Sequence, residues 1–375
     1  MRAVKKDITS VWVVQPKLKI NLPDNNSDQS IGEAIALAKA LPFVKIIGST
    51  VVPIERIRPK EFFGSGKVVE LAETFKSTKI NLVIINGQIS PIQQRNLEKK
   101  WHVKVLDRTA LILEIFSHRA VTREGVLQVD MAALTYQRSR LVRAWTHLER
   151  QRGGLGFVGG PGETQIEADK RAIDHQLVRL RRQLDKIKNT RELHRKSRAK
   201  VPFPIVALVG YTNAGKSTLF NLLTGASEFS VDMLFATLDP KMRAINLDNR
   251  VKIILSDTVG FISDLPTELI AAFRATLEEV LAADLILHVR DISHDNTENQ
   301  AVEVKKVLRN LGISESTPVL ELWNKMDIVE PEKLNGLKNI AERRLSVCSL
   351  SATTGEGVSG LVEAIKNQVE PQKFS

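Results

Sequence analysis

The first third of the chain alternates short apolar runs with amphipathic segments. The apolar runs predict strands over residues 10–14, 44–52, 80–85 and 103–106, and the amphipathic segments predict helices over 31–41, 67–75 and 91–100. Alternating strands and helices are typical of a parallel sheet that helices cover. We therefore expect an N-terminal α/β domain with a βαβ arrangement over residues 1–125.

Residues 126–200 carry apolar side chains at heptad-like spacing in two separate stretches. The first consists of Leu127, Met131, Leu134, Leu141, Trp145 and Leu148, and the second of Ile166, Ile173, Leu177, Leu180, Leu184 and Ile187. Two helices whose apolar stripes face each other pack along those stripes. The spacing therefore predicts an antiparallel helical hairpin.

The connection between these two helices is rich in glycine. Residues 152–162 contain six glycines in eleven positions, and glycine loses more backbone freedom on ordering than any other residue. An antiparallel helix pair needs only about 2 to 8 linking residues. We therefore favour a loop that becomes ordered against a partner over a plain flexible turn.

Residues 201–375 follow a hinge-like Val-Pro-Phe-Pro sequence and form the third predicted domain. Apolar runs predict strands over 205–209, 250–256, 319–323 and 347–350, and amphipathic runs predict helices over 218–223 and 357–369. The first of these strands leads into Gly210-Tyr211-Thr212-Asn213-Ala214-Gly215-Lys216-Ser217-Thr218. A strand, the pattern Gly-x4-Gly-Lys-Ser and a helix together form a P-loop.

A P-loop predicts a nucleoside triphosphate site with Mg²⁺. Its backbone amides surround the α and β phosphates, Lys216 reaches the β and γ phosphates, and the Ser217 hydroxyl ligates Mg²⁺. A second magnesium contact is expected from Asp257 through a water molecule, because Asp257-Thr258-Val259-Gly260 follows a predicted strand. The amide of Gly260 would sense the γ-phosphate.

Two further segments complete the set of motifs that a GTPase requires. Phe235-Ala236-Thr237-Leu238-Asp239 lies where a first switch is expected, and Thr237 is the preferred hydroxyl ligand for Mg²⁺, although Thr224 and Thr258 fit by residue type. Asn324-Lys325-Met326-Asp327 and Ser351-Ala352-Thr353 each follow a predicted strand. The carboxylate of Asp327 accepts hydrogen bonds from guanine N1–H and the exocyclic amine, which adenine does not offer, so these segments predict GTP specificity.

The predicted fold is thus α/β, with an N-terminal βαβ domain, a basic antiparallel helical hairpin and a Ras-like P-loop GTPase domain over 201–375. The chain has 375 residues, of which 43% are hydrophobic, and this excludes a disordered or fibrous protein. A single cysteine, Cys348, excludes a disulfide framework and indicates the cytoplasm. No apolar run has the length of a signal peptide or a transmembrane helix.

The formal charge of +11 is unevenly distributed. Residues 1–137 carry +7, residues 138–200 carry +10, and residues 201–375 carry −6. Such asymmetry indicates a polyanionic partner for the middle segment, although a solvated face or anionic lipid remain as alternatives. The candidate RNA contacts are Arg138, Arg140, Arg143, Arg150, Arg152, Arg179, Arg181 and Arg182 on the outer helix faces, with Gly153, Gly154 and Phe157 in the loop.

A second glycine-rich run, Gly64-Ser65-Gly66-Lys67, resembles a P-loop only in part. The position that would hold the first glycine is Glu61, which would repel phosphate. We therefore favour a turn that leads into a helix. The alternative is an ATP site in the N-terminal domain.

The whole set of motifs resembles the HflX family of translation-factor-class GTPases. The resemblance rests on Gly153-Gly154-Leu155-Gly156-Phe157, Gly160-Pro161-Gly162-Glu163-Thr164-Gln165, Asp107-Arg108-Thr109, Glu124-Gly125-Val126-Leu127-Gln128-Val129 and Phe235-Ala236-Thr237-Leu238-Asp239-Pro240. It spans most of residues 10–370. The resemblance implies a ribosome-associated GTPase that binds rRNA of the large (50S) subunit near the peptidyl-transferase centre. It also implies the splitting of stalled or hibernating 70S ribosomes under stress. Separately, we expect a monomer.

Two residues and the end of the chain bear on this resemblance. Phe261 stands where many Ras-like GTPases have a water-orienting Gln, so slow intrinsic hydrolysis that a partner stimulates is expected. Asn213 is similar to the asparagine of relatives that use K⁺, and a role in holding the loop backbone is the equal alternative. Many family members continue past the position of Ser375 into a small further domain.

Three other functions fit parts of the sequence. One is an RNA-remodelling, helicase-like NTPase with a second nucleotide site in the N-terminal domain. Another is a GTPase of ribosome assembly. The third is a binding module whose switch has lost activity, which Phe261 suggests.

Overall fold

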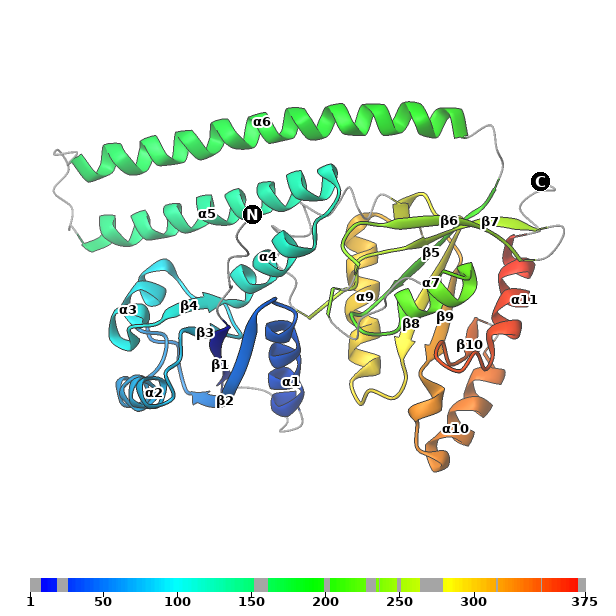
Figure 1. Cartoon of the computed structure of the whole chain (residues 1–375), viewed down its shortest axis with the longest axis horizontal. Coiled ribbons are helices and arrows are strands. Elements are labelled where there is room, and N and C mark those ends of the chain that lie inside the picture. The colour runs from blue at the N-terminus through cyan, green and yellow to red at the C-terminus, as the bar shows by residue number, and fades with distance from the viewer. Residues whose placement is uncertain are drawn as a thin grey trace, which may run out of the picture. The chain divides into compact units, whose positions relative to one another are not determined.

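The computed structural model describes residues 8–18, 26–151, 161–198, 203–226, 234–235, 237–247, 251–263, 279–314, 316–344 and 346–369. The chain divides into two compact units (Figure 1). One consists of residues 1–118 with 127–185, and the other of residues 119–126 with 186–375. Within the described residues, no helix combines the length and the apolar character that crossing a membrane requires.

The N-terminal unit contains a four-stranded parallel sheet in the order β2-β1-β3-β4. Its strands are β1 (Thr9–Leu18), β2 (Val44–Ile54), β3 (Leu82–Ile85) and β4 (Lys104–Asp107), and its helices are α1 (Asn26–Lys39), α2 (Ser65–Ser77), α3 (Pro91–Trp101) and α4 (Arg108–Arg119). The βαβ arrangement predicted from the sequence is confirmed. Because βαβ crossovers are right-handed, α1 covers one face of the sheet and α2 with α3 the other.

Aromatic side chains fill the space between α2, α3 and the sheet. The rings of Phe75 and Trp101 meet edge to face with centroids 5.1 Å apart, and Trp101 Nε1 donates to the carbonyl of Val68 at 2.9 Å. This satisfies the polar end of a side chain that is otherwise surrounded by apolar neighbours. Ser90 begins α3 with a capping box in which its hydroxyl accepts from the amide of Gln93.

The middle segment forms a helical hairpin from α5 (Arg123–Gln151) and α6 (Pro161–Arg198), as predicted. In α6 the predicted seam residues Ile173, Leu180, Leu184 and Ile187 are half-buried and Leu177 is buried, whereas Arg179, Arg181 and Arg182 are exposed. The two helices are also joined by an ion pair, since Arg138 Nε lies 2.6 Å from Asp174 Oδ1. Residues 152–160 of the predicted glycine loop lie outside the described residues.

The C-terminal unit contains a six-stranded sheet in the order β10-β9-β8-β5-β7-β6, in which β6 is antiparallel to β7 and the other pairs are parallel. The strands are β5 (Ile205–Gly210), β6 (Lys241–Asn246), β7 (Lys252–Asp257), β8 (Leu285–Asp291), β9 (Val319–Asn324) and β10 (Val347–Ser349). The helices are α7 (Lys216–Thr224), α9 (Thr297–Leu311), the short 3₁₀ helix Met326–Ile328, α10 (Pro331–Glu342) and α11 (Val358–Val369). Of these, β6, β8, α9 and α10 lie outside the elements predicted from the sequence.

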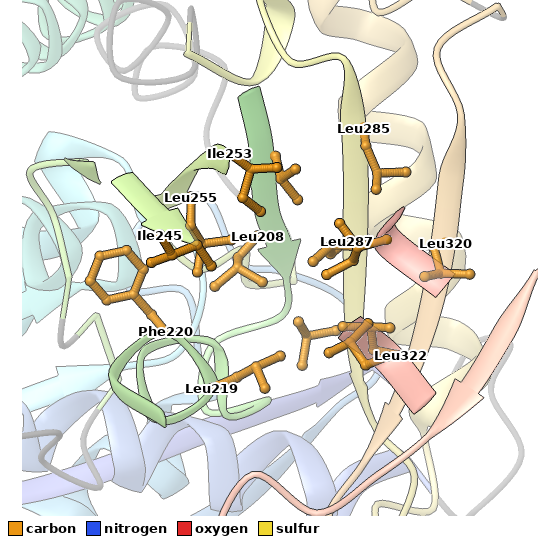
Figure 2. Packing of buried hydrophobic residues seen from close by; sticks show 14 of the residues in the cluster. Leu208, Leu219, Phe220, Ile245, Ile253, Leu255, Leu285, Leu287, Leu320 and Leu322 are labelled. Carbon is orange, nitrogen blue, oxygen red and sulfur yellow. The ribbon is translucent and has the colours of Figure 1, made fainter. Parts of the chain in front are cut away.

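The core of this sheet is built from aliphatic side chains of the central strands. Figure 2 shows Leu208 of β5 and Leu255 of β7 on the side of α7, which contributes Leu219 and Phe220. Leu287 of β8 lies beside Leu320 and Leu322 of β9. Cys348 of β10 packs against this cluster as a half-buried thiol. Parallel strands direct their carboxyl ends to one edge of a sheet, and ligands of α/β proteins bind at that edge. The predicted motifs follow β5, β7, β9 and β10.

Candidate nucleotide site

The P-loop connects β5 to α7, and two of its glycines are required by close neighbours. A Cβ at Gly210 would lie 2.2 Å from the carbonyl oxygen of Val289, and one at Gly215 would lie 2.2 Å from Nδ2 of Asn324. Gly215 also has a left-handed φ of 93°, which other residues rarely adopt. Any side chain at either position would therefore displace the loop from the strands that hold it.

Lys216 is the buried cation of the loop. Its Nζ donates to the carbonyl of Tyr211 at 2.7 Å, so the ammonium is held within the curve of the P-loop. Burial lowers the pKa of Lys216 to about 8, and the carboxylate of Asp257 opposes that shift. An ammonium held in this way is ready for an anionic ligand, whose charge would stabilise the protonated form.

Three oxygen-bearing side chains from separate elements meet beside Lys216. Ser217 Oγ lies 2.7 Å from Asp257 Oδ2 and 2.9 Å from Thr237 Oγ1, and Thr237 Oγ1 donates to the same carboxylate oxygen at 2.9 Å. Asp257 is 1% exposed, and its other oxygen, Oδ1, is buried without a hydrogen-bond partner. Burial raises the pKa of Asp257, while Lys216 and the two hydroxyls oppose the shift.

These three side chains fit a magnesium ion. Mg²⁺ prefers hard oxygen ligands and keeps several waters, so two hydroxyls and a carboxylate that acts through water form a suitable set. The unpartnered Oδ1 of Asp257 supplies the acceptor that such a water needs. The predicted ligands Ser217, Thr237 and Asp257 are therefore brought together by the fold, whereas Thr224 uses its hydroxyl on the carbonyl of Phe220 and Thr258 on that of Leu208.

The segment after Asp257 lies against the P-loop. A Cβ at Gly260 would lie 2.8 Å from Thr212 Cγ2 and 3.0 Å from Lys216 Nζ. The amide of Phe261 donates to the carbonyl of Gly210 at 3.1 Å, and its carbonyl accepts from the amide of Thr212 at 2.7 Å. The Phe261 side chain is buried, so this position carries an apolar ring packed in the protein and no amide that could orient water.

Asn324 links the P-loop to the segment that follows β10. Its Nδ2 donates to the carbonyl of Ala214 in the P-loop at 2.8 Å, and its Oδ1 accepts from the amide of Ala352 at 2.9 Å. Asp327 is exposed, as a residue that reads a base must be before the base arrives. Lys325 has a left-handed φ of 65° and places Nζ 2.8 Å from Asp291 Oδ2.

Several predicted residues lie around this arrangement. Tyr211, Thr212, Ala214, Val259, Phe235, Leu238, Met326 and Ser351 are buried, Thr218 is half-buried, and Asn213 and Thr353 are exposed. Ala236, Arg152, Gly153, Gly154 and Phe157 lie outside the described residues, and of Arg143 and Arg150 only the helical backbone is described.

Arg140 points inward and does not lie on the outer helix face where the sequence placed it. Its side chain is only 16% exposed. One guanidinium nitrogen, Nη1, lies 3.2 Å from Asp107 Oδ2 and 2.7 Å from the Tyr136 hydroxyl. Tyr136 in turn donates to both Asp107 oxygens at 2.8 Å. A buried carboxylate at the end of β4 needs a cation, and α5 supplies it. Arg138 is also engaged, through its ion pair with Asp174.

The partial P-loop at Gly64 forms a turn that leads into α2, as favoured from the sequence. Lys67 Nζ lies 2.5 Å from Glu70 Oε1, and the buried Glu61 pairs with Lys100 at 2.9 Å. A phosphate would meet the Glu61 carboxylate here. The geometry therefore gives no support to a second nucleotide site.

Sequence reasoning missed two contacts that hold the loops of the site in place, one made by Asp291 and one by the Tyr211 hydroxyl. Asp291 at the end of β8 holds Lys325, and the Tyr211 hydroxyl accepts from the amide of Ser263 at 2.6 Å. The apolar run of β8, Leu285–Asp291, is the signal that identifies Asp291, because it ends in a carboxylate at the sheet edge where the other motifs lie. Nothing in the local sequence distinguishes the Tyr211 hydroxyl.

Comparisons with known proteins agree with this arrangement. Residues 28–117 match the family profile described as GTP-binding GTPase N-terminal, residues 119–198 that of the GTP-binding GTPase Middle Region, and residues 205–325 that of the 50S ribosome-binding GTPase. The protein named GTPase HflX from Magnetococcus marinus is 50% identical over 87% of this chain and 74% of its own length. GTPase HflX from Escherichia coli is 44% identical over 86% of this chain and 74% of its own length.

A solved structure with the same fold extends over the whole chain. It is described as SsGBP in complex with GDP, and it covers 98% of this chain and 100% of its own, with 25% identity and a TM-score of 0.54. A GTP-binding protein from the archaeon Sulfolobus solfataricus, also in complex with GDP, covers 97% of this chain and 99% of its own, with 23% identity and a TM-score of 0.51.

Proposed function

Because the chain belongs to the HflX family of P-loop GTP hydrolases, we propose that it hydrolyses GTP with Mg²⁺ on the large ribosomal subunit and splits stalled or hibernating 70S ribosomes under stress. The proposal of GTP hydrolysis with Mg²⁺ rests on the contacts among the side chains of Ser217, Thr237 and Asp257 beside Lys216. The observation that supports the ribosomal part is the match of residues 205–325 to the 50S ribosome-binding GTPase family.

In this proposal the metal and the phosphates are held by the P-loop and the two switch segments. Ser217 and Thr237 would ligate Mg²⁺ directly and Asp257 would hold it through water, while the loop amides would bind the α and β phosphates and Lys216 the β and γ phosphates. When bound, the metal would supply positive charge that stabilises the phosphates during hydrolysis. Gly260, which has no side chain against Thr212 and Lys216, presents its amide to the γ-phosphate.

Guanine is proposed to bind between the two loops that Asn324 joins. The exposed carboxylate of Asp327 accepts from guanine N1–H and the exocyclic amine, and residues Ser351, Ala352 and Thr353 border the base. Adenine would leave this carboxylate unpaired, which costs about 1–3 kcal/mol or more for a desolvated charged group. GTP and GDP are therefore the expected ligands.

Hydrolysis is proposed to be slow until the ribosome is bound. The buried Phe261 ring offers the attacking water no orienting amide at that position, and such a group supplied in trans is worth about 10³ to 10⁵ in rate. Asn213, exposed at the rim of the P-loop with a left-handed φ of 63°, is placed to help hold a K⁺ ion that would neutralise developing charge.

The hairpin is proposed to enter rRNA. Arg179, Arg181 and Arg182 are exposed on α6, and guanidinium groups form two-pronged contacts with phosphate. The proposed RNA contacts also include Arg143, Arg150 and Arg152 with Gly153, Gly154 and Phe157. We expect the protein to act in the cytoplasm as a monomer that binds the 50S subunit.

The test is sedimentation of the full chain with 70S ribosomes and isolated subunits under GTP, GDP and a non-hydrolysable GTP analogue. We expect the protein to move with 50S subunits and 70S particles to separate under GTP or the analogue. Lys216→Ala should abolish the dependence on nucleotide. No association with 50S subunits under any nucleotide, or unchanged binding after removal of residues 153–162, would contradict the proposal.

A further inference from the structure

Asp239, at the end of the first switch, is bonded to the start of α5. Its Oδ2 accepts from the backbone amides of Val121 at 3.0 Å and Thr122 at 2.9 Å, and its Oδ1 accepts from the Thr122 hydroxyl at 2.5 Å. All of these residues belong to the same compact unit, which takes in residues 119–126 together with the GTPase domain. One carboxylate therefore holds three donors that lie more than 100 residues away in the sequence.

The bonded residues form the N-terminal cap of α5. The Thr122 hydroxyl accepts from the amide of Gly125 at 3.0 Å, and the Thr122 carbonyl accepts from the amide of Val126 at 3.0 Å. The first amides of a helix lack partners within the helix and attract negative charge. Asp239 supplies that charge from the switch, at the amides of Val121 and Thr122, which directly precede α5.

Gly125 shows that the contact leaves no room for a side chain. A Cβ at this position would lie 2.3 Å from Asp239 Oδ1 and 3.1 Å from Thr122 Oγ1. Glycine within a helix costs about 1 kcal/mol relative to alanine. A glycine in the first turn of α5 is therefore unfavourable for the helix and necessary for the approach of the carboxylate.

The same short segment carries the hydroxyl at the metal site. Thr237 lies two residues before Asp239, and its Oγ1 contacts Ser217 and Asp257 at 2.9 Å. Leu238 between them is buried, which restricts how far one end can move without the other. The two ends of this segment are thus fixed to the metal site and to α5.

We propose that Asp239 is a positioning residue for GTP hydrolysis, because its bonds to the first turn of α5 hold Thr237 at the metal site. The inference rests on the proposed role of Thr237 as a ligand of Mg²⁺. Coupling of this kind is reciprocal. A nucleotide that orders Thr237 strengthens the cap of α5, and a partner that displaces the start of α5 withdraws Thr237.

The first experiment measures hydrogen exchange in the full chain without nucleotide, with GDP and with a non-hydrolysable GTP analogue. The reporters are the amides of Val121, Thr122 and Gly125. We expect slower exchange with the analogue than with GDP, by about tenfold, which corresponds to 1.4 kcal/mol. In Asp239→Ala the amides should exchange faster in every state, and the difference between nucleotides should disappear.

The second experiment measures turnover and nucleotide affinity in variants. Asp239→Ala and Gly125→Ala should each lower kcat by about tenfold or more, as expected for loss of hydrogen bonds to a charged group. Affinity for GDP should stay within about twofold, because GDP does not require the γ-phosphate switch. The double variant should be no slower than either single variant, since both substitutions disrupt the same contact between Asp239 and the start of α5.

Two matched substitutions serve as controls. Gly360→Ala changes the third residue of α11, where an added Cβ meets nothing within 4 Å, so it should leave turnover unchanged. Thr122→Ser keeps the hydroxyl that Asp239 binds and should retain the activity of the wild type. Thr122→Val removes that hydroxyl and leaves the two amide bonds to Asp239, so it should lower kcat by less than Asp239→Ala does.

The results separate this inference from the proposed metal site. Slow turnover in Thr237→Ala with normal turnover in Asp239→Ala would overturn the positioning role alone. Normal turnover in Thr237→Ala would contradict the metal role of Thr237 and with it the inference. Equal exchange of the three amides under GDP and the analogue in the wild type would also overturn it, because a plain helix cap does not respond to nucleotide.

Discussion

At the scale of single residues, burial of Lys216 links phosphate binding to pH. The ammonium has been removed from water and bonds to one carbonyl, so its pKa falls to about 8 from the model-compound value of 10.5. In the nucleotide-free protein the unfolded chain binds more protons than the folded chain between these two values. The free energy of unfolding should therefore rise as pH increases through this window.

The affinity for GTP should have the opposite dependence. A triphosphate stabilises the protonated form of Lys216, so binding above pH 8 takes up a proton and weakens by up to about tenfold per pH unit. Titration calorimetry between pH 7 and 9, in two buffers of different ionisation enthalpy, measures both the affinity and the proton uptake.

The control for this prediction is Lys216→Arg, whose cation does not titrate in the window. The guanine base of GTP itself begins to lose a proton near the upper end of this pH range. Any loss of affinity from that cause should be the same in the variant and in the wild type. Affinity that declines equally in both proteins, without proton uptake specific to the wild type, would contradict the assignment.

At the scale of elements, the seam residues and the arginines of α6 differ in exposure. Leu177 is buried and the other seam residues are half-buried, whereas Arg179, Arg181 and Arg182 are exposed. By contrast, Arg140 on α5 neutralises Asp107 and is not available to a partner. Among the predicted arginines whose side chains the structure describes, the three of α6 are therefore the exposed ones.

We expect the three arginines of α6 to set the salt dependence of 50S binding. Replacing Arg179, Arg181 and Arg182 with Ala should reduce the slope of log affinity against log salt by about 2, from the loss of up to three phosphate contacts at about 0.7 to 0.9 each. Binding isotherms from 50 to 200 mM salt would measure it.

A triple variant in the acidic C-terminal segment is the matched control. Arg309, Arg343 and Arg344 are exposed on the GTPase domain, and their replacement with Ala removes the same total charge. If both triple variants change the slope equally, the effect belongs to net charge and the role of α6 is wrong.

At the scale of the whole molecule, charge and chemistry occupy different segments. The −6 segment contains the triphosphate site, where a buried Lys216 and loop amides attract the phosphates locally, while the +7 and +10 segments carry the attraction for a larger polyanion. The buried ring of Phe261 supplies no amide that could orient water at that position. Both features suit an enzyme whose reaction is completed by the partner that it binds.

Single-turnover hydrolysis should therefore be stimulated by 50S subunits on the order of 10³-fold, the contribution of a water-orienting or charge-stabilising group supplied in trans. Rapid mixing of GTP-loaded protein with 50S subunits would measure the rate, with 30S subunits as the control. The absence of stimulation would favour a binding module whose switch has lost activity.

The sequence by itself determined most of the strands, the hairpin and the chemistry of the site. Alternating apolar runs identified the strands of the N-terminal sheet, heptad spacing identified the hairpin, and short motifs identified Lys216 and Asp257, because each signal is contained within a few turns or one loop. The apolar run of β8 carried the same kind of signal and was missed.

Only the tertiary structure decided which polar side chains meet. Arg140 turns inward because Asp107 ends a strand beside it, Asn324 joins Ala214 to Ala352, and Asp239 bonds to Thr122, 117 residues earlier, at the start of α5. A local pattern records which face of an element is apolar, and it contains no information on the partner that a polar group finds across the fold. The link between the switch and α5 is therefore a property of the folded chain.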